Sequence, residues 1–286
     1  MISSPKETLP GLRDLLAFYA QAGVDEALDE EPADRFAEGR RATEAVAPLL
    51  PGSGEVRAQP PQPSIRSPAP AARVEPRPAT AVPDEKQIAL ARERAGQAET
   101  LDELRQRLAE FDGCNLKFTA KNLVFADGNP DAGIMLVGEA PGRDEDLEGL
   151  PFVGRSGQLL DRMLAAIGLD RQSVYIANVI PWRPPGNRTP TPQETEICRP
   201  FIERQIELAN PRLLITLGGP SAKLLLKTSE GILRLRGGWK SHVTASGTAI
   251  PAMPTLHPAY LLRNPAHKKL AWRDLLEVKA RLRELG

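Results

Sequence analysis

The chain has 286 residues, enough for one sizeable hydrophobic core with a tail or for two modest domains. Its 37 basic and 37 acidic side chains give a formal net charge of zero, which excludes binding to nucleic acid by bulk charge but not by a local basic groove. Two cysteines, Cys114 and Cys198, exclude a disulfide-rich scaffold, and we expect a reducing, cytoplasmic setting.

The first 84 residues divide into two segments by composition. Residues 1–30 lack the pattern of a signal peptide, and apolar residues at three- and four-residue spacing predict one short amphipathic helix there. Residues 31–84 are rich in Pro and Ala, and ten of the chain's 28 prolines fall between residues 48 and 83. We expect a disordered linker there, because such a stretch buries too little surface to offset its chain entropy. The alternative is a proline-rich ligand for another domain.

Residues 85–286 read as one domain. A helical pattern at its start gives way to short apolar runs that alternate with further helical patterns. The expected strands lie at residues 134–137, 174–177, 213–217 and 252–256, and the expected helices between them at 157–167, 192–208 and 220–226. This alternation predicts an α/β fold with a mainly parallel sheet and helices on both faces. No apolar run reaches the roughly 18 residues of a membrane span, so we expect no membrane association.

Unusual residues gather where the four expected strands end, which is where open α/β sheets bind ligands. The first strand runs into Gly138-Glu-Ala-Pro-Gly142 and then Pro151-Phe-Val-Gly-Arg-Ser-Gly157. The later strands lead to Asn178 with Trp182-Arg-Pro-Pro-Gly-Asn-Arg188, to Gly218-Gly-Pro-Ser221, and to His257-Pro-Ala-Tyr-Leu-Leu-Arg263. Each segment alone fits an ordinary turn or a structural histidine. Four of them in this order are much more specific.

Over roughly residues 110–283, these motifs resemble family 4 uracil-DNA glycosylases in order and spacing. The resemblance implies the three-layer α/β/α fold of the uracil-DNA glycosylase superfamily. It also implies base excision repair of DNA: uracil is flipped out of single- or double-stranded DNA and its N-glycosidic bond is hydrolysed, leaving an abasic site. We expect a monomer that acts on DNA without a membrane. The resemblance leaves open whether other deaminated bases are accepted, and the partner of residues 1–30 is unknown.

The resemblance assigns the base pocket to a few residues. Phe152 would stack on uracil, and Gly138 and Ala140 would line the pocket beside it. Asn178 would read the uracil edge, because its amide offers both an acceptor for N3–H and a donor for O4. His257 would donate to O2 as negative charge builds on the departing base. The alternatives are a core phenylalanine at 152 and a turn-capping asparagine at 178.

Two carboxylates are candidates for orienting water or stabilising the cationic sugar. In relatives from another family an aspartate does this, where the present chain has Ala140. The resemblance points to Glu139 first and Glu145 second. A tyrosine of those relatives excludes thymine, whereas Gly142 leaves that side open.

The remaining candidates would contact DNA. Ser156 and Ser221, at expected helix starts, are suited to phosphates, and three arginines would add positive charge, although a solvated surface role fits each of them equally well. Leu261 matches the superfamily's wedge, which fills the gap left by the flipped base. The arginines are Arg183, Arg188 and Arg263.

The chain departs from family 4 in its cysteines. The family holds an iron–sulfur cluster with four of them, and here Cys114 and Cys198 take the first and last positions while Lys117 and Trp182 take the other two. A cluster of this type needs four ligands, and neither an ammonium nor an indole N–H can supply one. We therefore expect no cofactor and no metal. We expect Trp182 to fill the vacated volume and Lys117 to turn toward solvent or a carboxylate.

Two functions besides catalysis stay open. The chain could bind uracil or abasic DNA without turnover, or it could be an accessory module of a DNA polymerase. The second would explain residues 1–84 but not the pocket residues. The preferred strand form and the affinity for the abasic product cannot be read from the sequence.

Overall fold

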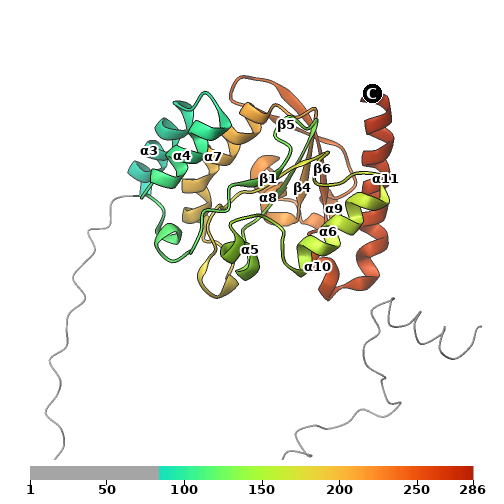
Figure 1. Cartoon of the computed structure of the whole chain (residues 1–286). Helices are drawn as coiled ribbons and strands as arrows, with labels where there is room; N and C mark the ends of the chain where they lie inside the picture. Colours follow the sequence, from blue (N-terminus) through green and yellow to red (C-terminus); the bar gives the residue numbers. More distant parts are fainter. Residues whose placement is uncertain (1–83, 286) are drawn as a thin grey trace, which may run out of the picture. The chain divides into compact units, whose positions relative to one another are not determined.

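A computed structural model describes residues 84–285, and its centre is a six-stranded sheet (Figure 1). The strand order is β1-β3-β2-β4-β6-β5. The strands are β1 (Ala126–Gly128), β2 (Ile134–Gly138), β3 (Tyr175–Asn178), β4 (Leu213–Leu217), β5 (Lys240–Val243) and β6 (Ala249–Thr255). Strands β3, β2, β4 and β6 run parallel, while β1 and β5 add antiparallel edges. The four expected strands are these parallel ones, so the predicted α/β fold with a mainly parallel sheet is confirmed.

Helices cover both faces of the sheet, as Figure 1 shows. Side chains of β2 alternate between the two resulting cores because successive residues of a strand point to opposite faces. Met135 and Val137 pack with the helices of one face, and Ile134 and Leu136 with those of the other. One layer contains α3 (Asp84–Gly96), α4 (Leu101–Glu110) and α7 (Pro192–Ala209), and the other contains α6 (Arg155–Ala166) and α11 (Lys268–Leu285). The architecture is the three-layer α/β/α arrangement.

Local sequence explains where α7 begins. Its N-cap Thr191 accepts a hydrogen bond from the Glu194 amide, and the Glu194 carboxylate accepts one from the Thr191 amide at 2.8 Å. Pro192 occupies the first turn, where its missing N–H costs no hydrogen bond. This start fixes the loop between β3 and α7, which lies beside the functional site described below.

Short elements follow the carboxyl ends of the parallel strands and carry the strand-end motifs. They are α5 (Arg143–Glu148) after β2, the 3₁₀ turn η2 (Pro185–Asn187) after β3, α8 (Gly219–Leu225) after β4 and α10 (Pro258–Arg263) after β6. Three further pieces are η1 (Asn115–Phe118), α9 (Ile232–Leu235) and η3 (Pro265–His267). Because four of these elements meet at one edge of the sheet, the motifs come together there.

The predicted N-terminal helix and linker, at residues 1–30 and 31–84, lie outside the described residues apart from Asp84, which begins α3. The boundaries proposed for these segments and for the domain at 85–286 stay predictions. No helix between residues 84 and 285 is both long and apolar enough to cross a lipid bilayer.

Candidate active site

A cavity of about 490 Å³ opens at the carboxyl ends of the parallel strands. Gly138 of β2 pairs in register with Asn178 of β3, and Leu217 of β4 pairs with Thr255 of β6, so the four strands end at the same level. The cavity holds nine of the thirteen predicted site residues: Glu139, Ala140, Glu145, Phe152, Ser156, Asn178, Arg188, His257 and Arg263. The prediction that these segments converge is therefore confirmed by their placement.

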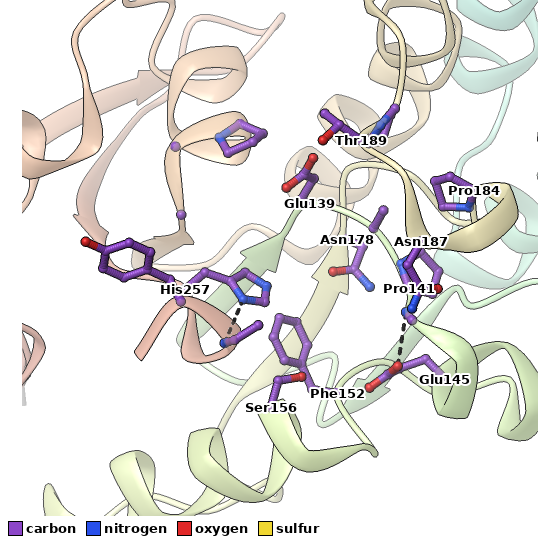
Figure 2. Close-up of a pocket in the computed structure, with 18 of the residues that line it drawn as sticks. Glu139, Pro141, Glu145, Phe152, Ser156, Asn178, Pro184, Asn187, Thr189 and His257 are labelled. Atoms are coloured by element: carbon purple, nitrogen blue, oxygen red, sulfur yellow. Dashed lines mark hydrogen bonds between the residues drawn. The ribbon is translucent and has the colours of Figure 1, made fainter. Parts of the chain in front are cut away.

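His257 is the N-cap of α10, and its ring is held as a neutral hydrogen-bond donor (Figure 2). The Ala259 amide donates to Nδ1 at 3.1 Å, so the proton of the neutral ring sits on Nε2. Burial, and secondarily the charge of Arg263, lowers the pKa of His257 to about 4. Gly218, at φ 97°, makes room: a Cβ there would lie 3.1 Å from the His257 Cβ. The neutral ring therefore offers one N–H to a ligand at physiological pH.

Asn178 presents an amide that the protein leaves incompletely bonded. The residue is only 5% exposed, and its Oδ1 has no hydrogen-bond partner within the described chain. An unpaired buried polar group costs about 1–3 kcal/mol, so it is retained where a ligand completes it. A Cβ on Gly138 would lie 2.4 Å from this Oδ1, which explains the glycine beside it. Asn178 therefore has the geometry of a ligand-reading group rather than of a turn cap.

Phe152 forms one wall of the cavity and is also packed into the core. It therefore fits both alternatives from the sequence, a residue that stacks on the base and a core phenylalanine. It is 4% exposed, and its ring centroid lies 5.4 Å from that of His257 at an interplanar angle of 30°. Its φ of 56° lies in the left-handed region, a conformation that costs a non-glycine residue about 1–3 kcal/mol and is typical of functional sites. A Cβ on Gly138 would lie 2.6 Å from the Phe152 ring, so Gly138 also clears space for it.

Glu139 follows β2 directly and faces the cavity on the side opposite Phe152 (Figure 2). Its backbone carbonyl accepts from the Ile180 amide at 2.9 Å, which fixes the residue relative to β3. Its carboxylate has no hydrogen bond or ion pair within residues 84–285, and burial raises its pKa. A half-buried, unpaired carboxylate beside a hydrogen-bond donor is suited to orient water or to face a developing positive charge.

Glu145 borders the cavity, but its carboxylate is already used. Oε2 accepts from the Gly142 amide and Oε1 from the Gly154 amide, each at 3.0 Å. A Cβ on Gly142 would lie 2.7 Å from Oε2, so the glycine makes room for this bond. The hypothesis that Glu145 acts as a second catalytic carboxylate is not supported by this geometry. Glu145 instead ties the loop after β2 to the loop that carries Phe152.

The predicted DNA contacts divide into two groups. Ser156 lies in the first turn of α6, and Arg188 and Arg263 are exposed at the cavity rim. Arg188 also pairs with Glu194 at 2.6 Å, and that hydrogen bond raises the pKa of Arg188. Arg183 lies outside the cavity and donates to the Asn187 Oδ1 at 2.6 Å.

Two of these predictions are wrong as placed. The Ser221 side chain is fully buried and its hydroxyl bonds to the carbonyls of Leu217 and Gly218, so it offers nothing to a phosphate. Leu261 is 1% exposed and packs in a small core cluster with Leu256, whereas a wedge must project from the surface. Leu262, next in the chain, is 38% exposed. The helical turn of α10 puts Leu261 on the inner face.

The cavity also contains residues that sequence reasoning missed. The loop after β3 contributes four such residues to the cavity: Pro184, Asn187, Thr189 and Pro190. Only arginines of this loop had been predicted as site residues from the sequence. Tyr260 lines the opposite side and its hydroxyl lies 2.8 Å from His267 Nδ1. The Pro-Pro-Gly-Asn sequence was a turn signal that placed this loop, but nothing in it showed that the turn folds over the cavity.

The four positions where family 4 has cluster cysteines form a corner behind this loop, here called the cysteine corner: Cys114, Lys117, Trp182 and Cys198. The Cys198 thiol donates to the Cys114 sulfur at 3.9 Å, and both are fully buried. Trp182 is 2% exposed and belongs to the same hydrophobic cluster, while Lys117 pairs with Asp112 at 2.5 Å. Both side chains are placed as expected. Two thiols, a packed indole and a paired ammonium do not fit a four-thiolate cluster.

Comparisons with known proteins agree with this site. The family model of the uracil DNA glycosylase superfamily matches residues 125–276. A type-4 uracil-DNA glycosylase of Thermotoga maritima is 36% identical over 194 residues, which are 66% of this chain and 97% of the relative. Those of Saccharolobus solfataricus and Archaeoglobus fulgidus are 40% and 42% identical over 189 and 171 residues, covering 64% and 58% of this chain and 87% and 85% of the relatives. The chain therefore belongs to the uracil-DNA glycosylase superfamily.

Proposed function

We propose that the protein is a uracil-DNA glycosylase, a hydrolase of base excision repair that flips uracil out of DNA and cleaves its N-glycosidic bond. The observation that carries this is the buried Asn178 amide, unpaired at Oδ1, in one cavity with the neutral His257 donor and Phe152. The type-4 uracil-DNA glycosylases described above support the same activity.

Uracil recognition follows from Phe152 and Asn178. The flipped ring stacks on Phe152, which forms one wall of the cavity. The Asn178 Oδ1 accepts from N3–H, and its Nδ2 donates to O4. Cytosine has an acceptor at N3 and a donor at C4, so it would meet both groups with the wrong polarity. Such a bidentate mismatch is worth about 1–3 kcal/mol by analogy with groove readout.

Bond cleavage uses His257 and Glu139. As the glycosidic bond lengthens, negative charge moves onto uracil O2 and positive charge onto the sugar. The His257 Nε2–H stabilises the leaving base without giving up its proton, because a ring with a pKa of about 4 is neutral at pH 7. The unpaired Glu139 carboxylate faces the sugar side, where it orients the attacking water and stabilises the cation. The products are free uracil and an abasic site.

DNA is held at the rim by local charge rather than by total charge. Arg188 and Arg263 reach backbone phosphates, and the first turn of α6 at Ser156 offers amide N–H groups. We propose that the protein acts as a monomer in the cytoplasm and without a membrane. Gly142 lacks a side chain beside the base, which favours acceptance of further deaminated bases.

The direct test is incubation with a 5′-labelled oligonucleotide containing one uracil, followed by alkali, which cleaves at abasic sites. Strand cleavage is the expected result, with a matched cytosine oligonucleotide uncut. A retarded but intact strand in a gel shift would instead indicate a non-catalytic binder of uracil or abasic DNA. If the strand is neither cleaved nor retarded, the accessory-module hypothesis is favoured and the proposal fails.

Base reading is tested with the Asn178→Asp variant, since the change replaces the Nδ2 donor with a carboxyl oxygen in a side chain of nearly the same shape. Uracil release should fall by about 5- to 100-fold, the factor that corresponds to losing one good polar contact. Cytosine release, measured on the same single-turnover time scale, should rise relative to uracil release because a protonated carboxyl presents the reversed pattern. An unchanged ratio of the two rates would show that Asn178 does not read the base.

A further inference from the structure

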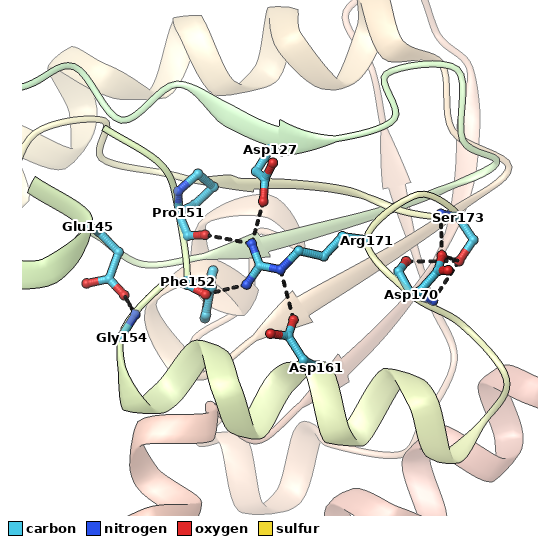
Figure 3. Close-up of polar contacts among 9 residues, drawn as sticks. All are labelled: Asp127, Glu145, Pro151, Phe152, Gly154, Asp161, Asp170, Arg171 and Ser173. Atoms are coloured by element: carbon cyan, nitrogen blue, oxygen red, sulfur yellow. Dashed lines mark hydrogen bonds and ion pairs between the residues drawn. The ribbon is translucent and has the colours of Figure 1, made fainter. Parts of the chain in front are cut away.

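The loop that carries Phe152 is held from behind by Arg171, a residue outside every motif at the strand ends. Arg171 lies in the turn between α6 and β3 and does not line the cavity. Its Nη2 donates to the Phe152 carbonyl, and its Nη1 donates to the Pro151 carbonyl at 3.2 Å (Figure 3). These bonds fix two consecutive peptide units of the loop.

The guanidinium is itself anchored on two sides of the fold. Nη1 pairs with Asp127 of the edge strand β1, and Nε donates to Asp161 of α6 at 2.9 Å. The turn that carries Arg171 is closed by Asp170 and Ser173, whose side chains bond to each other's backbone amides at 2.8 and 3.0 Å. A planar fork with five N–H donors can serve four acceptors at once, whereas an ammonium cannot do so in this geometry.

The Phe152 carbonyl needs such a fixed partner because the backbone there is unusual. Phe152 adopts φ 56°, and a Cβ on Gly157 would lie only 1.6 Å from the Phe152 carbonyl oxygen. The carbonyl is thus pressed between the first turn of α6 and the guanidinium. Two residues further along the loop, the Glu145 carboxylate accepts a hydrogen bond from the Gly154 amide at 3.0 Å. The loop is therefore held at Pro151 and Phe152 by Arg171 and at Gly154 by Glu145 (Figure 3).

We propose that Arg171 is a positioning residue that sets the plane of the Phe152 ring through the Phe152 carbonyl. The inference rests on the proposed function, because it takes the ring to be the surface on which uracil stacks. Because Arg171 does not line the cavity, we expect its effect to reach the reaction through the loop. A misplacement of about 1 Å at a reacting group can lower a rate about 100-fold.

The kinetic test compares Arg171→Lys with the matched control Arg204→Lys. Arg204 also bonds a backbone carbonyl, that of Ala98, and a carboxylate, that of Glu207, and its side chain is 25% exposed against 24% for Arg171. It lies on α7, outside the cavity. Arg171→Lys should lower the single-turnover rate at saturating DNA about 10- to 100-fold, with half-saturation changed less than about threefold. Arg204→Lys should leave both within about twofold.

A double-mutant cycle with Phe152→Ala separates positioning from a general structural role. If Arg171 acts through Phe152, adding Arg171→Lys to Phe152→Ala should lower the rate by less than about twofold more, because the ring that Arg171 positions is gone. Multiplied losses would overturn the proposal.

Hydrogen–deuterium exchange supplies a readout that needs no glycosylase activity. In Arg171→Lys, amides of residues 150–157 should exchange at least tenfold faster, while the strand-end peptides around Asn178 and His257 stay unchanged. Unchanged exchange in 150–157 would overturn the proposal. A wild-type protein without glycosylase activity would sink the proposed function yet leave this measurement interpretable.

A milder variant covers the case in which Arg171→Lys does not fold. Asp161→Asn weakens one anchor of the guanidinium at a side chain that is 47% exposed, so the fold should tolerate it. The same loop should exchange faster and the rate should fall, each about two- to fivefold. A variant with wild-type exchange and rate would count against Arg171 as a clamp.

Discussion

The cavity and the cysteine corner are both formed at motif positions of one superfamily, yet polar groups of the cavity lack partners within the described chain and those of the corner have them. In the cavity, Asn178 has an unpaired buried oxygen and the Glu139 carboxylate has no partner within the described residues. In the corner, Lys117 is paired and the Cys198 thiol bonds to Cys114. The hydrogen bond to Cys114 and burial raise the pKa of Cys198 well above its usual value.

This contrast separates residues kept for chemistry from residues kept for packing. Unpaired buried polar groups lower stability, so such a group inside a cavity favours a ligand that completes it. A corner whose groups are satisfied or apolar contributes to stability instead. Changes in the cavity should therefore alter rates with little effect on folding, and changes in the corner should do the reverse.

The largest effect on stability is expected for Trp182→Ala. Removing a buried Trp side chain leaves a cavity and lowers the free energy of unfolding by about 3–5 kcal/mol. The indole is 2% exposed in the main hydrophobic cluster, so the upper part of this range applies. Urea denaturation of Trp182→Ala measures it, with Trp182→Phe as the control that keeps an aromatic ring in the corner. A loss below 1 kcal/mol would mean that Trp182 does not fill the corner.

His257→Ala tests the other region. The single-turnover rate of uracil release should fall about 10²- to 10³-fold, the usual consequence of removing one donor to a developing anion. The affinity for uracil-containing DNA in a gel shift should change less than about threefold, because the contact strengthens only as charge develops. The free energy of unfolding should fall by no more than about 2 kcal/mol, the usual cost of losing a helix N-cap. An unchanged rate would remove His257 from the mechanism.

The pH dependence distinguishes Glu139 from His257. Burial raises the pKa of Glu139, so lowering the pH protonates this carboxylate at a higher pH than a free glutamate. If the carboxylate is the active form, the rate should fall about tenfold per pH unit below that pKa, and Glu139→Gln should abolish the limb. His257, with a pKa of about 4, stays neutral above about pH 4.

The same shift fixes the sign of a stability effect. A carboxyl whose folded pKa is raised binds its proton more tightly in the folded state, so its contribution to stability is lost as pH rises through that pKa. Glu139→Gln should therefore raise the melting temperature at pH 7 relative to wild type and leave it nearly unchanged at pH 4. A lower melting temperature at pH 7 would mean that Glu139 has a stabilising partner.

The parallel core could be predicted because apolar residues form continuous runs in the buried strands and recur at helical spacing in the helices that cover them. Edge strands β1 and β5 could not, since three or four residues give too little pattern. Missing β5 matters for His242, because this strand turns its ring inward, where it is 2% exposed. The pocket residues follow motifs, whereas Arg171 acts through backbone carbonyls and has no motif to show it. Leu261 and Leu262 are neighbours on α10, and only the phase of the helix decides which of the two is buried.

The smallest effect is expected from treatment with an iron chelator. Protein purified anaerobically should be colourless, without absorbance from sulfur-to-iron bands and without stoichiometric iron. Four protein ligands are needed to complete the irons of a cubane cluster, and the chain has two cysteines in total. Those two thiols contact each other inside a hydrophobic cluster, and the other two positions carry a packed indole and an ammonium bound to Asp112. Incubation with an iron chelator should therefore change neither the rate of uracil release nor the melting temperature.

Lys117→Cys with Trp182→Cys is the matched comparison, because it returns four thiols to the corner while leaving the cavity intact. Brown wild-type protein with about four irons per chain would show that the corner still binds a cluster, and the contrast between the two regions would then fail.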